Sequence, residues 1–445
     1  ISTLIGIITT GIDNKLDELR KGRSAVIEMN HTIIFGWSEQ IFTIIKELVL
    51  ANENQVKSCI VILGEKDKVE MEDEIRNKVG KTGRTKVVCR QGNPIDLNDI
   101  ELVGLNTSKS IIIISPDADD PDSYVIKTLL AIVNNPNRRK EHYNIVVELR
   151  DEKNIEVAQL IGKTEAEIVL IGDLISKIIA QTCRQSGLSQ VYGEILSFEG
   201  NEIYFKEEPA LTGKKYSEAL FRYESSMVIG IKKSGRLPEL NPVPETEIEP
   251  GDELIFIAED DDTMVLDKNQ DIPVNKELII RKEDSRPVPE KTLILGWNWR
   301  IIGIVNELDS YVPSGSELFV AAEYSEGEEI IKEQCKSCTN QTVKYINADT
   351  TDRRNLEKLN VGQFNHIIIL CYSDTLEPQK ADAKTLITLL HLRDIAEKQG
   401  YKFSIVSEMI DIRNRNLAEI TRADDFIISD KLTSQIISQV SENKF

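Results

Sequence analysis

The sequence predicts an α/β protein with two doubly wound parallel sheets of the Rossmann type and a small α+β domain between them. Three features predict this fold: an internal repeat, a regular alternation of apolar runs with amphipathic segments, and a change of this pattern between the two repeats. The chain has 445 residues, which is the length of about three ordinary domains.

The internal repeat has an offset of about 260 residues. HTIIFGWSEQIFTIIKEL at 31–48 matches KTLILGWNWRIIGIVNEL at 291–308, and IIIIS at 111–115 matches IIILC at 367–371. The remaining matches are DSYVIKTLLAI at 122–132 with DAKTLITLLHL at 382–392, IVVELRDEKN at 145–154 with IVSEMIDIRN at 405–414, and VLIGDLISKIIAQ at 169–181 with IISDKLTSQIISQ at 427–439. Matched blocks in the same order indicate a duplicated domain.

Each repeat alternates short apolar strands with amphipathic helices. In the first repeat we expect strands at 31–35, 58–63, 86–89, 110–115, 144–149 and 167–171. The helices expected between them lie at 39–51, 69–78, 94–102, 122–134 and 154–162. Continuous apolar runs such as 111–114 are typical of strands buried on both faces of a parallel sheet. In the second repeat the last helix is expected at 432–440.

Between the repeats the pattern changes to hairpin signals. EILSFEGNEIYF predicts a hairpin that turns at Gly200 and Asn201, and MVIGIKKSGRLPEL predicts one that turns at Ser234 and Gly235. PGDELIFIAEDD predicts a turn followed by an apolar strand. These signals favour a small α+β domain at 183–267, followed by a linker at 268–290.

The composition restricts the charged partners. The net charge of −20 repels phosphate backbones, so we expect no nucleic-acid binding and favour cations. Cysteine is sparse for a chain of this length, so a disulfide scaffold is not expected and reduced thiols are. Cys335 and Cys338 have CxxC spacing but neither a second pair nor a nearby histidine, which disfavours a zinc site.

The amino terminus begins with an uncharged apolar stretch, ISTLIGIITTGI, which is followed by Lys15, Arg20, Lys21 and Arg23. The stretch is shorter than the ~20 residues that span a bilayer. Two interpretations remain open: an exposed helix or trimmed end, and the last turns of a membrane helix with its cytoplasmic basic flank. Because the chain starts with isoleucine, we expect the parent protein to extend upstream.

A Rossmann turn normally holds GxGxxG, whose glycines let the backbone approach a pyrophosphate. The two repeats instead have GWSEQI and GWNWRI, so Gly36 is kept while Ser38 and Asn298 replace the second glycine. Gly36 and Glu65, the latter at the end of the second strand, are therefore candidates for a degenerate nucleotide site, and we expect no NAD. No catalytic motif accompanies the histidines, so an enzyme is not expected.

Acidic clusters are the remaining chemical signal. SPDADDPD places Asp117, Asp119, Asp120 and Asp122 after the fourth strand, at the sheet edge where ligands of such folds bind. Other candidates are Glu148 with Asp151, which recur as Glu408 with Asp411, and the run 259–262. Converging carboxylates suit calcium. The alternative for each cluster is a solvated acidic loop.

Several sequence segments of the chain resemble the RCK domains that regulate potassium channels, and more closely the CASTOR/POLLUX family of cation channels and its bacterial relatives. These segments are LDELRKGRSAVIEMNHTIIFGWS at 16–38, LANENQ at 50–55, EKDKVEME at 65–72, GDELIFIAEDDDT at 251–263 and LGWNWR at 295–300. They occur in order over nearly the whole chain. The family pattern would add a second small domain after Phe445.

The resemblance implies a gating ring of a tetrameric channel in the cell membrane, with this portion cytoplasmic and calcium as the regulator. It implies the end of a pore-lining helix at 1–13, a linker at 14–30, RCK Rossmann lobes at 31–182 and 291–445, and the small RCK lobe between them. Self-association would use the helices at 122–134 and 382–393. The alternatives are a nucleotide-sensing regulatory subunit of a potassium uptake system and a dinucleotide-dependent oxidoreductase.

Overall fold

The computed structural model describes residues 22–116, 118, 120–267, 275–278, 280, 288–411, 413–414 and 425–442. The chain divides into two compact units, one formed by Ile1–Ser189 with Pro289–Phe445 and one formed by Gln190–Val288. The predicted membrane helix at 1–13 lies outside the described residues. Within the described part of the chain, no helix is both long and apolar enough to cross a bilayer.

The first lobe of the larger unit is a parallel sheet of six strands in the order β3-β2-β1-β4-β5-β6. The strands are β1 His31–Phe35, β2 Ser58–Gly64, β3 Thr85–Gln91, β4 Ser108–Ile113, β5 Ile145–Leu149 and β6 Ala166–Leu170. The helices are α2 Gln40–Ala51, α3 Lys68–Lys78, α4 Leu97–Glu101, α5 Pro121–Val133, α6 Ile155–Gly162 and α7 Ile171–Arg184. β1 is buried along its whole length, as its run of apolar residues predicts.

The second lobe repeats this topology with the order β13-β12-β11-β14-β15-β16. Its strands are β11 Lys291–Leu295, β12 Ser316–Ala322, β13 Gln341–Asn347, β14 His366–Ile369, β15 Ser404–Met409 and β16 Asp425–Ile428. Its helices are α10 Ile301–Tyr311, α11 Gly327–Gln334, α12 Arg353–Lys358, α13 Pro378–Gln399 and α15 Ser429–Glu442. The identical strand order confirms the duplication and the α/β fold class.

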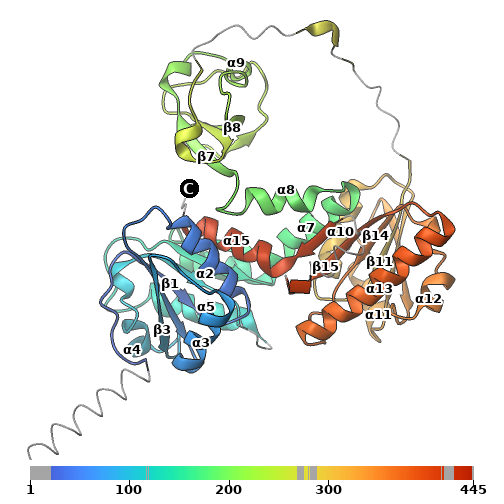
Figure 1. Cartoon of the computed structure of the whole chain (residues 1–445), viewed down its shortest axis with the longest axis horizontal. Helices are drawn as coiled ribbons and strands as arrows, with labels where there is room; N and C mark the ends of the chain where they lie inside the picture. The colour runs from blue at the N-terminus through green and yellow to red at the C-terminus, as the bar shows by residue number, and fades with distance from the viewer. Residues whose placement is uncertain are drawn as a thin grey trace, which may run out of the picture. The chain divides into compact units, whose positions relative to one another are not determined.

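The two lobes exchange their last helices. In Figure 1, α15, in red, lies against the blue first lobe, where it packs on α2, β4 and β5. In the opposite sense, α7 packs on α10, β14 and β15 of the second lobe. Hydrogen bonds repeat across both contacts: the Ser434 hydroxyl donates to the Gln40 carbonyl (3.2 Å) and the Ser176 hydroxyl to the Arg300 carbonyl (3.4 Å). Each sheet is therefore completed by a helix of the other repeat.

The smaller unit holds an antiparallel sheet of four strands in the order β7-β10-β8-β9. These strands are β7 Glu202–Glu207, β8 Met227–Lys232, β9 Glu239–Leu240 and β10 Glu253–Ala258. The predicted hairpin between β8 and β9 is confirmed, with Gly235 in the left-handed region at φ 70°. The hairpin predicted at Gly200 is wrong, because α8 (Leu188–Ile195) extends into its first strand, the residues up to Gly200 form turns, and β7 pairs with β10.

Candidate functional site

The Rossmann turns keep their first glycine for a backbone reason. Gly36 and Gly296 have φ values of 104° and 102°, in the region that favours glycine. A Cβ at Gly36 would lie 2.8 Å from the Ile114 carbonyl oxygen, and one at Gly296 would lie 2.1 Å from that of Leu370. The turn therefore approaches the neighbouring strand too closely for a side chain, whether or not a nucleotide binds.

Aromatic side chains occupy the space beside both turns. Trp297 is buried, and its ring stacks on Tyr324 with centroids 4.7 Å apart. Trp37 packs edge-on against Phe42 at 5.6 Å. Glu65 is exposed at the end of β2, as a solvated strand-end acid would be.

The acidic loop before α5 uses its described carboxylates for local structure; Asp117 and Asp119 lie outside the described residues. Asp120 caps α5 by accepting from the Ser123 N–H at 3.3 Å, and this hydrogen bonding to Ser123 lowers the pKa of Asp120. Asp122 is buried and accepts from three donors across the sheet edge. These donors are the Arg150 N–H (2.9 Å), the Asp151 N–H (3.0 Å) and the Asn154 amide (2.7 Å).

The second lobe repeats this clamp with Asp382. Its carboxylate accepts from the N–H groups of Ile410 (2.9 Å) and Asp411 (3.0 Å) and from the Asn414 amide (2.7 Å). The same three contacts in both lobes show that this aspartate holds the loop after the fifth strand. The role of a structural clamp was not predicted from the sequence.

Asp151 is also engaged. It caps the short 3-10 helix η2 (Glu152–Asn154) by accepting from the Lys153 N–H at 3.0 Å, and its carboxylate contacts the Lys153 ammonium at 2.5 Å. The hydrogen bond from Lys153 lowers the pKa of Asp151. The carboxylate is about half exposed and faces a cation of its own loop.

Glu148, at the end of β5, differs from the other acidic candidates because it is buried and weakly bonded. Only 1% of its surface is exposed, and its carboxylate accepts from the Ser115 N–H at 3.0 Å and from the Gln40 amide at 3.4 Å. Burial raises the pKa of Glu148 to about 7; the Ser115 N–H and the Arg150 charge oppose this rise, while the Asp430 charge adds to it. Glu148 is thus a buried carboxyl whose two hydrogen-bond donors are both uncharged.

Its counterpart in the second lobe, Glu408, already has a cationic partner. The buried Arg300 guanidinium forms a salt bridge with Glu408. The Asn298 amide also donates to Glu408 at 2.7 Å, and the Ser429 hydroxyl donates at 2.5 Å. Equivalent carboxylates therefore stand in different electrostatic surroundings.

A polar cleft of about 1260 Å³ lies where the two lobes meet. It is lined by residues of both lobes, among them Asp120, Asp122, Arg150, Asp151, Trp299 and Asp374. A Cβ at Gly172 of α7 would lie 2.5 Å from the Trp299 ring, so this wall of the cleft is closely packed. The sequence did not indicate Trp299, because its contact partner belongs to the other repeat.

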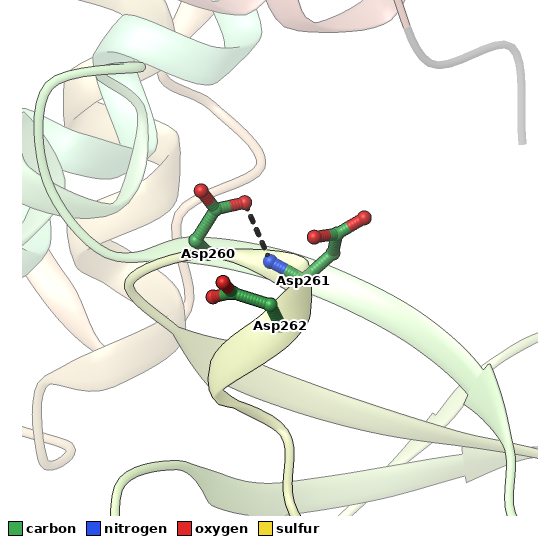
Figure 2. A group of neighbouring side chains, drawn as sticks. All are labelled: Asp260, Asp261 and Asp262. Atoms are coloured by element: carbon green, nitrogen blue, oxygen red, sulfur yellow. Dashed lines mark hydrogen bonds between the residues drawn. The ribbon is translucent and has the colours of Figure 1, made fainter.

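The run 259–262 forms a separate acidic cluster in the smaller unit. Figure 2 shows Asp260, Asp261 and Asp262 at the start of a short helical turn, with Asp260 bonded to the Asp261 N–H at 2.7 Å. Their carboxylate oxygens come within 4.8 Å of one another, and all three residues are exposed. Exposure to water is a sufficient account of this cluster.

Comparison with known proteins places the first lobe in the class of RCK domains. A family model described as "Calcium-activated potassium channel slowpoke-like RCK domain" matches residues 28–171. A second model, "Castor and Pollux, part of voltage-gated ion channel", matches residues 172–274. The two matches adjoin, and together they extend from the first lobe into the smaller unit.

The curated relatives are plant ion channels. The chain is 31% identical to "Probable ion channel POLLUX" of Oryza sativa subsp. japonica over 100% of its length, and 30% identical to "Ion channel CASTOR" of Lotus japonicus over 99%. It spans 49% and 56% of these relatives, respectively. The resemblance to the CASTOR/POLLUX family is thereby confirmed over about half the length of these relatives.

Solved structures show the same fold. The human SLO3 gating ring aligns with a TM-score of 0.62 at 14% identity, covering 93% of this chain and 83% of that one. The GsuK RCK domain aligns with a TM-score of 0.51 at 15% identity, covering 94% and 78%. These neighbours confirm the prediction of RCK-type Rossmann lobes.

Proposed function

We propose that this chain is the gating portion of a tetrameric membrane cation channel, in which calcium binding changes the arrangement of the lobes and this change acts on the pore. The observation that carries the proposal is the relation to CASTOR and POLLUX ion channels over the whole chain. The likeness to a structure described as a gating ring supports it.

The exchange of helices between the lobes supplies a physical route for such gating. Because α15 covers the sheet of the first lobe and α7 covers that of the second, neither lobe can rotate without changing both helix contacts. A ligand that binds one arrangement more tightly than another shifts the equilibrium by the difference of its two binding free energies, typically about 1–3 kcal/mol. Symmetric assembly would multiply this effect.

Exposed apolar residues on α5, α6 and α13 support self-association. Leu130, Val157 and Leu160 are 45%, 46% and 76% exposed, and Ile387 and Leu390 on α13 are 43% and 53% exposed. α5 and α6 pack against each other, so the first three side chains belong to one helix pair. Apolar side chains grouped in this way favour burial against another protein surface, and we assign them to contacts between copies of this chain.

Conductance and oligomeric state test the proposal. The full-length protein, reconstituted in planar bilayers, should conduct cations with an open probability that changes with calcium on the side of this domain. In ultracentrifugation, the chain should form dimers or tetramers that Leu160→Glu with Leu390→Glu weakens, while Leu237→Glu on the smaller unit does not. Calcium-independent currents would contradict the regulation, and a monomer at high micromolar concentration would contradict the assembly.

A further inference from the structure

The two lobes place equivalent groups of polar side chains at the carboxyl edges of their sheets. The first lobe forms what we call the Glu148 pocket from Ser38, Gln40, Ser115 and Glu148, and the second lobe forms the Glu408 pocket from Asn298, Arg300, Cys371 and Glu408. The internal repeat places these residues in register, pair by pair. The difference that matters is Gln40 in place of Arg300.

In the Glu408 pocket a side chain provides the positive charge. Arg300 is 8% exposed and lies beside a glutamate that is 1% exposed, so both charges are removed from water together. Asn298 orders this pair by donating to Glu408 at 2.7 Å and to the Cys371 carbonyl at 3.0 Å. A buried carboxylate is stable in such a place because a cation is fixed against it.

In the Glu148 pocket the corresponding side chains offer oxygen atoms. The hydroxyls of Ser38 and Ser115 and the Oε1 atom of Gln40 are buried and have no hydrogen-bond partner among the described residues. Ser38 and Ser115 are 5% and 0% exposed. Buried polar atoms without partners are rare in proteins and need an explanation. Two of these residues contact the Glu148 carboxylate, Ser115 through its N–H and Gln40 through its amide nitrogen. Ser38 stands at the position of Asn298, which contacts Glu408 in the second lobe. The partnerless oxygens of these residues together indicate a ligand that they share.

The charges around Glu148 do not supply that ligand. Arg150 and Asp430 are the charged groups that act on Glu148, and their effects on it are of opposite sign. Neither the Arg150 guanidinium nor a lysine donates a hydrogen bond to Glu148 among the contacts of the described chain; its donors are a backbone N–H and an amide. When Glu148 is ionised, its buried negative charge is therefore only partly compensated.

The donor set selects the class of ligand. A carboxylate, two hydroxyls and an amide oxygen are hard ligands, which calcium prefers in sets of about six to eight oxygens, some of them from water. The Gln40 amide contacts Glu148 through its nitrogen at 3.4 Å, which is long for a hydrogen bond. Rotation of this amide by half a turn would direct Oε1 toward the same place.

We propose that a hard metal cation, calcium in the first instance, binds in the Glu148 pocket at the position that corresponds to the Arg300 guanidinium of the second lobe. This inference rests on the calcium part of the proposed function and assigns it a site. The exchanged helix α15 lies next to the residue that carries one of these oxygens, because the Ser434 hydroxyl of α15 contacts the Gln40 backbone carbonyl at 3.2 Å. Occupancy of the pocket is thus linked to the packing of one lobe on the other.

The sharpest test inserts the arginine of the second lobe into the first. Calcium at about 1 mM should raise the melting temperature of the wild-type chain, since a ligand that binds only the folded state stabilises it. Gln40→Arg should melt higher than wild type in EGTA and should lose the response to calcium. Glu148→Gln should weaken calcium binding at least about tenfold in calorimetry, and Asp260→Asn with Asp261→Asn should leave it unchanged.

The results of these experiments distinguish a failure of this site from a failure of the proposed calcium regulation. An equal calcium response in wild type and Gln40→Arg would overturn the site while leaving calcium regulation through other carboxylates intact. No calcium binding to wild type would overturn both. If circular dichroism shows that Gln40→Arg does not fold, a crystal structure of the wild-type chain grown in calcium chloride tests the site instead. An anomalous peak between Glu148 and Ser115 supports the site, and an ordered water there overturns it.

Discussion

The two Rossmann lobes have one strand order and one clamp, yet they surround the same buried glutamate differently. Asp122 and Asp382 make the same three hydrogen bonds, whereas Glu148 faces Gln40 and Glu408 faces Arg300. The clamp holds a loop that both sheets need, so both repeats have it. The pocket is free to differ because a fixed guanidinium in one lobe maintains the structure while the other lobe remains open to a ligand.

The largest effect on the free energy of unfolding is expected when Arg300 is replaced. Arg300→Gln leaves Glu408 buried without its cation and should lower the free energy of unfolding by about 3–5 kcal/mol. Urea denaturation measures this loss. The double variant Arg300→Gln with Glu408→Gln should recover most of it, and Lys177→Ala, which removes a half-exposed surface pair, should cost less than about 0.5 kcal/mol. A small cost for Arg300→Gln alone would contradict the comparison of the pockets.

The next effect is a pH dependence of stability that arises from Glu148 in the first lobe. In metal-free protein the pKa of Glu148 is about 7 against an ordinary 4.5, so the folded state binds this proton more tightly than the unfolded state. Stability should therefore fall by about 3 kcal/mol as pH rises from about 4.5 to 7 and then level off. Denaturation at several pH values checks this. Glu148→Gln should remove this contribution to the slope, and parallel curves for the two proteins would refute the assignment.

A third prediction concerns the shared clamp, where the lobes should behave alike. Asp122→Ala leaves the N–H groups of Arg150 and Asp151 without their acceptor, and Asp382→Ala does the same to Ile410 and Asp411. Each variant should cost about 2 kcal/mol. Hydrogen exchange at these amides should quicken in the affected lobe only. A loss of calcium binding with unchanged stability would instead identify Asp122 as a ligand.

The smallest effect is expected when a dinucleotide is added, because we expect no tight binding to either Rossmann turn. The GsuK channel has been solved bound to NAD, but here Ser38 and Asn298 stand where a second glycine would allow the backbone to approach a pyrophosphate. Calorimetry with NAD should therefore give no submicromolar binding to wild type. Tight NAD binding that Glu65→Ala abolishes would favour a nucleotide sensor. The ligand site would then lie at the end of β2 and not at Glu148.

Much of the fold could be predicted because local periodicity reports it. β1 (His31–Phe35) begins and ends where the sequence predicts, and α2 (Gln40–Ala51) begins one residue late. The wrong hairpin at 194–205 has a local cause: EILSF alternates like a strand, but its first two residues belong to the amphipathic helix α8 (Leu188–Ile195). Pairing of β7 with β10 decided between the two, and sequence spacing does not encode that partner.

The candidate site was predicted only in outline. The sequence placed Asp120, Asp122, Glu148 and Asp151 at one sheet edge, because the carboxyl ends of parallel strands meet there. The sequence could not show which of these carboxylates is the best candidate for a ligand site, because that depends on the hydrogen-bond partners of each one. The structure shows that capping and clamping occupy three of these carboxylates, while Glu148 remains buried beside unpartnered oxygens.

By itself, the sequence determined the duplication, the alternation of strands and helices, and the family, because all three are recorded in residue order. Tertiary structure decided which helix covers which sheet and which carboxylate lacks a cation. The contact of Ser434 with Gln40 joins residues 394 positions apart. Apolar periodicity tells that a helix face will be buried, but its partner is set by the packing of the whole unit, where the two repeats complete each other.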